Sequence, residues 1–470
     1  MASFFIQQFG CRATQADGAA IERQLLTGGC HATTSPDDAD FVILNTCTVT
    51  SAADAQARDA IRKIHARNPA ARLIVTGCYA QRAPEELAAL PGVSFVVGNS
   101  HKPQIPGLVD TSIDRVSPAN LVSLQSLSGV PLAQRKTSAQ ILTGDIFSQS
   151  DVLVAPVLGG EGHHTRPTLK IQDGCNSRCA FCVIPFVRGK SRSLPPDRVI
   201  EELRRLSDAG SREIVLSGIN LGTWGRDLSP RAEFIDLVRR ILDETSVHRL
   251  RISSIEPLDV TQDLVELFAS TDRVAHHFHM PLQSGSDRIL AAMHRWYRTE
   301  HYARRIELIR SLLPYAAIGA DVIAGFPGET EDDHAATLSF IERFPFTYLH
   351  VFSYSQRPGT RAGALPSQVP PQAIKRRAGE LRSLGESKSA AFRRSQIGRT
   401  LRVLTLHRDD RDARDGVTPA LSSNYLPILV EGNHPHNQWL DALVTRGRDA
   451  GLVSAPALLC ESSAFSAPLR

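Results

Sequence analysis

Three cysteines near the middle of the chain have the spacing of a metal site, in the run Gly174-Cys-Asn-Ser-Arg-Cys-Ala-Phe-Cys-Val. The pattern Cys175-x3-Cys179-x2-Cys182 (the central cysteine set) supplies three thiolates, whereas a structural zinc site takes four protein ligands. A cubane [4Fe-4S] cluster held by three thiolates keeps one iron open for an external chelate. A zinc knuckle or three unrelated core cysteines is the alternative. The spacing therefore favours an iron–sulfur cluster with one open coordination position.

Three further cysteines (the N-terminal cysteine set) are far apart in the sequence, but each follows an expected strand. The strands and cysteines are 4–8 with Cys11, 41–44 with Cys47, and 73–75 with Cys78. Because parallel strands end at one edge of a sheet, these thiols could bind a second cluster, again with one open iron. If the sheet is not parallel, they are three independent buried cysteines. Cys30 and Cys460 have no such placement, and we assign them no role.

The elements that must position these cysteines alternate between strand and helix. From residue 3 to about 102 the alternation predicts a mainly parallel sheet covered by helices. From 168 to about 354 six strand-like runs recur, which predicts a partial, open, TIM-like (β/α)6 barrel. The runs are 168–172, 213–217, 250–254, 275–280, 317–324 and 348–353. The central set follows the first run, and barrel folds place their active sites at such strand ends.

Composition shifts along the chain predict an α/β protein of several domains. Residues 103–165 are rich in Ser, Gly, Gln and Pro, so we expect a long connection with room for a strand or two. Short β-branched runs after residue 398 predict a small all-β domain. The predicted boundaries are 1–125 for the N-terminal α/β domain, 126–165 for a linker, 166–375 for the barrel, 376–397 for a basic helix and 398–460 for the all-β domain.

With 470 residues, 42% of them hydrophobic and 22% charged, the composition is that of an ordinary globular protein. No apolar run approaches the roughly 20 residues of a membrane span, and residues 1–8 lack a signal-peptide layout. We therefore expect a cytoplasmic protein with no membrane partner. In that reducing compartment, eight cysteines favour metal or redox chemistry over disulfides. A net charge of +4 permits a nucleic-acid partner without predicting one.

Taken together, the two cysteine sets closely resemble those of the radical S-adenosylmethionine (SAM) methylthiotransferase family, and the resemblance covers nearly the whole chain. The runs 251–257, 279–286 and 325–330 look like the family's barrel-strand motifs, and the all-β end resembles the RNA-binding TRAM domain. The runs at 9–12, 45–50 and 170–175 look most like the branch that modifies N6-threonylcarbamoyladenosine beside the tRNA anticodon. Sister branches modify isopentenyladenosine in tRNA or an aspartate of a ribosomal protein.

The resemblance implies a mechanism with two [4Fe-4S] clusters. The cluster on the central set, taken as catalytic, would chelate SAM at its open iron and reduce it, giving a radical that takes hydrogen from the adenine C2 carbon. The cluster on the N-terminal set would hold or donate sulfur that another SAM methylates. The implied partners are the anticodon stem-loop of tRNA, an external electron donor and a sulfur source.

Five residues near barrel-strand ends are candidate SAM contacts: Phe181, Gly218, Asn220, Ser254 and Glu256. Gly218 and Asn220 could receive the methionine amino group. Ser254 and Glu256 could bind ribose hydroxyls, and Phe181 could contact adenine. The alternatives are a turn at Gly218, a cap at Ser254, a surface charge at Glu256 and a core position for Phe181.

Two basic segments are candidate RNA contacts. The loop with Arg188, Lys190 and Arg192 follows the central set, and the helix 376–394 precedes the all-β domain. Both could bind backbone phosphate, while the all-β domain could grip RNA by shape. Simple solvated surfaces are the alternative. We assign no metal to the histidines, including those at 276–279.

Other interpretations stay open. A different radical SAM enzyme could use its second cluster only for electron transfer, and a non-catalytic iron–sulfur or zinc protein could bind RNA. Two segments depart from the family pattern: 117–165 is longer than expected, and 408–419 interrupts the all-β domain.

Overall fold

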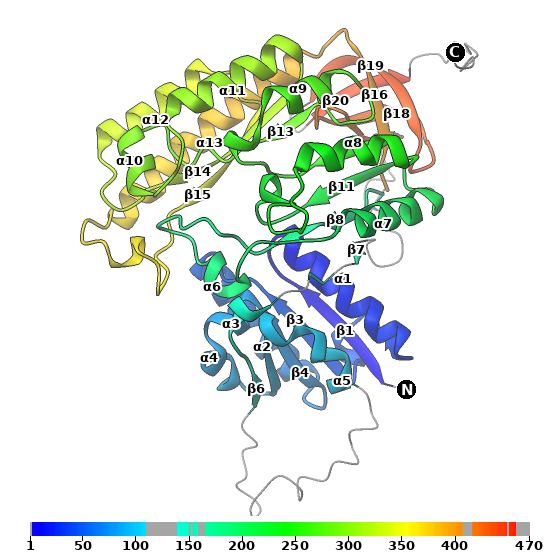
Figure 1. The fold of residues 1–470 in the computed structure, drawn as a ribbon, viewed down its shortest axis with the longest axis vertical. Helices are drawn as coiled ribbons and strands as arrows, with labels where there is room; N and C mark the ends of the chain where they lie inside the picture. The colour runs from blue at the N-terminus through cyan, green and yellow to red at the C-terminus, as the bar shows by residue number, and fades with distance from the viewer. Residues whose placement is uncertain are drawn as a thin grey trace, which may run out of the picture.

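The computed structural model describes residues 2–109, 139–149, 152–153, 155–157, 165–407, 416–448 and 451–456. Cys460, residues 110–138 of the long connection and residues 408–415 of the interrupting segment lie outside the described residues. Figure 1 shows the N-terminal sheet below the partial barrel, with the C-terminal strands beside the barrel. Within the described ranges, no helix is long and apolar enough to cross a membrane.

Apolar runs near the N-terminus form a six-stranded sheet in the order β2-β1-β3-β4-β5-β6, and every pair is parallel, as predicted. β3 is buried along its whole length, as in a sheet covered on both faces. The strands are β1 Ser3–Gln8, β2 His31–Ala32, β3 Phe41–Thr46, β4 Arg72–Gly77, β5 Val93–Gly98 and β6 Gln140–Leu142. The helices are α1 Arg12–Thr27, α2 Ser51–Arg67, α3 Cys78–Arg82, α4 Pro84–Ala88 and α5 Ile105–Val109. The edge strand β6 comes from the expected connection.

Six parallel strands and their helices form the open barrel that the sequence predicted. β12-β11-β8 form one sheet and β13-β14-β15 another, and the isolated parallel bridges 250–274 and 254–279 join them. The strands are β8 Thr168–Lys170, β11 Glu213–Ser217, β12 Arg249–Ile252, β13 His277–His279, β14 Ala317–Ala324 and β15 Tyr348–Ser353, with the short β7 Pro156–Val157, β9 Gln172–Asp173 and β10 Arg192–Ser193 beside them. The helices are α6 Ile184–Arg188, α7 Pro196–Asp208, α8 Phe234–Glu244, α9 Gln262–Ala269, α10 Asp287–Ala292, α11 Thr299–Leu312, α12 Glu331–Arg343 and α13 Pro371–Arg394.

The basic helix α13 begins five residues earlier than predicted and ends at Arg394 rather than at 397. Pro371 occupies its first turn, where proline needs no hydrogen-bond donor and its fixed φ suits a helix. Arg376 bonds Glu331 and Glu380, and the buried Arg377 bonds Glu329. Part of the charge assigned to RNA is therefore neutralised within the protein.

The C-terminal strands close into a small barrel in the order β16-β17-β18-β20-β19. They are β16 Thr400–Thr405, β17 Val417–Ser422, β18 Pro427–Glu431, β19 Trp439–Arg448 and β20 Gly451–Pro456. The all-β prediction is therefore confirmed, although the sequence patterns missed β17 and β20. This barrel docks on β12, where Arg249 and Arg251 donate to carbonyls of Leu421 and Ser422, each at 3.0 Å.

Candidate metal centres

The central set lies on the loop that follows β9. The Cys175 N–H donates to the Gly189 carbonyl at 3.1 Å, which ties the loop to the end of α6. Gly174 has a φ of +70°, and a Cβ there would lie 1.9 Å from the Lys190 carbonyl oxygen. Only glycine fits this close backbone approach, so the loop conformation depends on it.

The three central thiols share one partly buried space. Burial, together with the nearby Cys179 and Cys175 thiols, raises the pKa of Cys182 to about 12. Burial also raises the pKa of Cys179, against the opposing influence of Arg295. Without a metal the buried Cys179 and Cys182 therefore keep their protons, whereas a metal cluster would displace the protons and its positive charge would offset the repulsion between the thiolates.

Nitrogen donors surround these sulfurs. Arg295 Nη1 donates to Cys179 Sγ at 3.2 Å, and the same guanidinium is paired with Glu256. Asn220 Nδ2 lies 3.8 Å from Cys175 Sγ, while its Oδ1 is buried without a hydrogen-bond partner. Hydrogen-bond donors around thiolates stabilise their negative charge, so this set of nitrogen donors fits a bound cluster. The unpartnered Asn220 Oδ1 leaves one acceptor free for a ligand at the same place.

The candidate SAM contacts lie near the same end of the barrel. Gly218 and Asn220 follow β11, and the Asn220 N–H donates to Gln172 Oε1 at 2.8 Å. Ser254 Oγ lies 2.7 Å from His279 Nδ1, and Glu256 faces Arg295 as described. Phe181 is half-buried and packs against a small apolar group, as in its core alternative. Their role toward SAM stays a prediction.

The N-terminal set lies at one edge of the parallel sheet. Cys11 caps α1, Cys47 follows β3 and Cys78 begins α3, and β1, β3 and β4 are neighbours. A Cβ at Gly10, whose φ is +94°, would lie 2.5 Å from the Cys47 Cβ. Burial, together with the nearby Cys78 and Cys11, raises the pKa of Cys47 to about 12. The topology thus brings these three cysteines together.

Asn99 links this edge to the central loop. Its Nδ2 donates to the Val187 carbonyl at 2.6 Å and lies 3.6 Å from Cys78 Sγ, while Oδ1 is buried without a partner. Val187 belongs to α6, directly after the central cysteines. Each cysteine set therefore has an asparagine whose amide nitrogen faces a thiol, which fits a cluster at either site.

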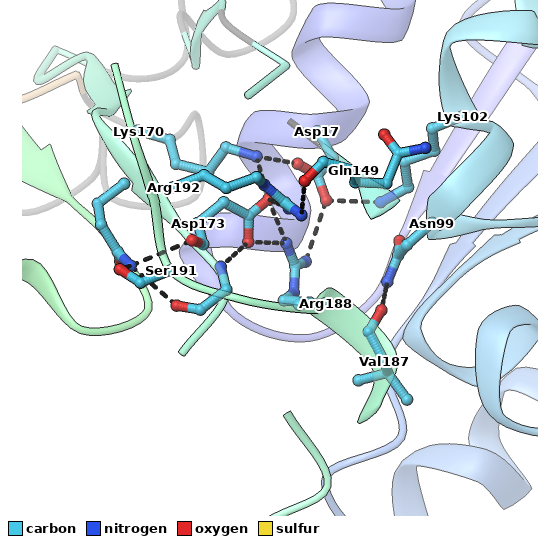
Figure 2. A network of polar contacts seen from close by, with 12 residues as sticks. Asp17, Asn99, Lys102, Gln149, Lys170, Asp173, Val187, Arg188, Ser191 and Arg192 are labelled. Atoms are coloured by element: carbon cyan, nitrogen blue, oxygen red, sulfur yellow. Dashed lines mark hydrogen bonds and ion pairs between the residues drawn. The ribbon is translucent and has the colours of Figure 1, made fainter. Parts of the chain in front are cut away.

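A buried network of charges joins the two regions, as Figure 2 shows. We call it the interface network: Asp17, Lys102, Lys170, Asp173, Arg188 and Arg192. Arg188 Nη2 lies 3.0 Å from Asp17 Oδ2 and its Nη1 lies 2.9 Å from Asp173 Oδ1. The prediction that Arg188 and Arg192 bind RNA is wrong, because both are buried and face these carboxylates. Only Lys190 of that loop is exposed.

Sequence patterns missed a polar group on three neighbouring strands. Asp321 Oδ1 lies 3.1 Å from His279 Nε2 and 3.3 Å from His350 Nδ1, and these donor atoms could hold a metal ion. Burial acts to raise the pKa of Asp321, but hydrogen bonding to both histidines holds it well below its usual range. Strand register places Asp321 opposite His350 across β14 and β15, and His279 reaches Asp321 from β13, where it pairs with Gly319.

Comparison with known proteins identifies both regions. Residues 169–341 match the radical SAM superfamily, and residues 3–98 match the uncharacterized protein family UPF0004. Two relatives named threonylcarbamoyladenosine tRNA methylthiotransferase MtaB, from Aquifex aeolicus and Bacillus subtilis, are 34% and 33% identical over 91% and 92% of this chain and 96% and 91% of their own. This chain belongs to the radical SAM tRNA methylthiotransferase family. As a methylthiotransferase it is a transferase, and the superfamily implies a [4Fe-4S] cluster and SAM.

Other similarities of this methylthiotransferase concern a sister branch and the fold. A tRNA-2-methylthio-N(6)-dimethylallyladenosine synthase of Syntrophobacter fumaroxidans is 36% identical over 81% of this chain and 79% of its own. The radical SAM methyltransferase TsrM of Kitasatospora setae, with tryptophan and a SAM analogue bound, superposes with a TM-score of 0.56 at 15% identity, covering 77% of this chain and 74% of that one. The second likeness concerns the fold alone.

Proposed function

We propose that this methylthiotransferase carries two [4Fe-4S] clusters and adds a methylthio group to C2 of N6-threonylcarbamoyladenosine in the anticodon stem-loop of tRNA. The observation that carries the proposal is the pair of three-cysteine sets, each with an amide donor beside a thiol and one buried ion network between them. When bound, the clusters supply the electron that cleaves SAM and the site that presents sulfur to the substrate.

The protein's own residues hold these groups in place. Arg295 neutralises thiolate charge at Cys179 and orients Glu256, whose carboxylate can then accept a hydrogen bond from a ribose hydroxyl. Burial raises the pKa of Glu256, while Arg295 opposes that rise and favours the ionised form. Asn220 presents its amide beside Cys175 at the end of β11. An external reductant and a sulfur source complete the reaction.

The substrate assignment rests on identity and coverage taken together. The two relatives named for threonylcarbamoyladenosine are 34% and 33% identical over 91% and 92% of this chain. Relatives named for dimethylallyladenosine either cover less of it, 81% for the Syntrophobacter protein, or are less identical, at 31% over 97%. The identities of 34%, 33% and 36% are too similar to discriminate between the nucleosides. Dimethylallyladenosine in tRNA is therefore the second candidate.

The test is an anaerobic reaction of the reconstituted protein with SAM, dithionite and tRNA that bears one nucleoside or the other. Nucleoside mass spectrometry should detect the methylthio derivative of threonylcarbamoyladenosine. Product only from dimethylallyladenosine would overturn the substrate assignment. Absence of SAM cleavage would overturn the enzyme mechanism.

Cysteine variants test the two cluster sites. Cys47→Ala should abolish methylthio product while SAM cleavage continues, because the central set stays intact. Cys30→Ala is the matched control: Cys30 packs in the same N-terminal region outside both sets, so product should persist. Methylthio product from Cys47→Ala at the wild-type rate would contradict the second cluster.

A further inference from the structure

The interface network contains more positive than negative charge. Lys102, Lys170, Arg188 and Arg192 face the carboxylates of Asp17 and Asp173, so four cations against two anions leave two positive charges in excess. None of the six side chains is more than 10% exposed. Burying unpaired charge is costly, so an excess of this kind calls for nearby negative charge.

The N-terminal cysteines lie beside this network, and their sulfurs become negative when they bind a cluster. Burial acts to lower the pKa of Arg188, but Asp173, Cys78, Asp17 and Cys11 together raise it well above its usual value. Contacts trace the same path: Arg188 Nη2 lies 3.4 Å from Thr14 Oγ1, which lies 3.6 Å from Cys11 Sγ. Nε of both Arg188 and Arg192 is buried without a hydrogen-bond partner.

A loaded N-terminal cluster would supply matching charge. An oxidised cubane core with two positive charges and three thiolates has a net charge of about minus one, and a monoanionic sulfur ligand on the open iron brings it to about minus two. Reduction adds one more negative charge. Positive groups nearby stabilise each of these states, most strongly where water is excluded.

We propose that the interface network is charge-matched to the loaded N-terminal cluster, with Lys102 and Arg192 as positioning residues that stabilise the cluster-bound state and favour cluster reduction. This inference rests on the second cluster of the proposed function. The network spans α1, the 99–104 segment, β8 and α6, so the same charges also couple cluster loading to the contact between the N-terminal sheet and the barrel.

The test compares Lys102→Met with wild type in the full chain, both with clusters loaded and cluster-free. Asp17 keeps Lys170 and Arg188 as partners in the variant. The thermal midpoint of the loaded protein should fall, while that of the cluster-free protein should hold or rise. The reduction potential is measured by EPR titration in a background where alanine replaces the central cysteines. The midpoint potential of the N-terminal cluster should be ~59 mV more negative in Lys102→Met, which corresponds to a tenfold smaller equilibrium constant for one-electron reduction.

Controls separate this role from ordinary ion pairing. Lys102→Arg should retain the wild-type potential. Arg377→Met removes a buried cation that pairs with Glu329 and Glu331 and belongs to no part of the interface network. It should lower the loaded and cluster-free midpoints equally without changing the potential. If Lys102→Met does not fold, Arg192→Met, whose nearest network carboxylate is 3.9 Å away, takes its place.

The outcomes distinguish the inference from the function beneath it. Equal destabilisation of loaded and cluster-free Lys102→Met, with an unchanged potential, would overturn the charge-matching. If the protein with only the central cysteines replaced binds no iron, the second cluster is overturned and the inference with it. If that protein binds the cluster but Lys102→Met changes neither its thermal midpoint nor its potential, only the inference is overturned.

Discussion

Glu213 holds the C-terminal barrel onto the radical SAM barrel through two arginines. It is fully buried on β11, and Arg251 Nε lies 2.7 Å from its Oε1, while Arg249 pairs with its Oε2. Both guanidiniums also donate to carbonyls of 421–423 in the C-terminal barrel. Glu213→Gln keeps the shape and removes the charge, leaving the buried Arg249 and Arg251 and the largely buried Arg166 without their counter-ion. Breaking a buried pair in this way costs about 3–5 kcal/mol.

Hydrogen exchange measures this cost locally, which suits a multidomain chain that need not unfold in one step. Amides of β12 and β17 that exchange through separation of the two barrels should exchange at least about a hundredfold faster in Glu213→Gln, since each 1.4 kcal/mol is tenfold. Glu233→Gln is the control: Glu233 is 53% exposed and pairs with the exposed Arg231, so the change should cost below about 1 kcal/mol. If both variants exchange alike, the reasoning fails.

The pH dependence of the same contact has a definite sign. Burial acts to raise the pKa of Glu213, but Arg251 and Arg249 outweigh it and hold the pKa well below its usual range. A carboxyl with a depressed folded-state pKa stabilises fully above its unfolded value of about 4.3, and the contribution is lost as pH falls toward the folded value. The difference in amide exchange rate between Glu213→Gln and wild type should therefore shrink below about pH 4.

Three further predictions concern the cluster sites. Gly174→Ala should lower iron content by about half, because its Cβ would meet backbone 1.9 Å away, whereas Gly210→Ala, also at positive φ but with open space, should retain iron. Arg295→Met should slow SAM cleavage to 5′-deoxyadenosine by about 10- to 100-fold through loss of the Cys179 and Glu256 contacts, and a wild-type rate would refute that role. In cluster-free protein, iodoacetamide at pH 7.5 should modify exposed Cys11 at least about tenfold faster than Cys182, because burial raises the pKa of Cys182 to about 12. The modification rate of Cys182 should rise about tenfold per pH unit. Peptide mass spectrometry measures both rates, and equal rates would contradict the burial argument.

Local patterns in the sequence determined much of the architecture. Alternating apolar and helical runs predicted the parallel N-terminal sheet, the six barrel strands and the all-β end, because burial and backbone periodicity act over a few residues. Close spacing also identified the central cysteines as a group. The N-terminal cysteines needed one further step, since Cys11, Cys47 and Cys78 meet only if the three strands before them are parallel and adjacent in the order β1-β3-β4.

Only the tertiary structure decided what the charged residues do. Arg188 and Arg192 look in sequence like an exposed basic loop, yet both are buried against Asp17 or Asp173. Asp17 lies 171 residues before Arg188, and no local pattern encodes that meeting. Arg295 reaches Cys179 across 116 residues in the same way. Charge is read from sequence, but whether water, a carboxylate or a thiolate surrounds it depends on how distant elements pack.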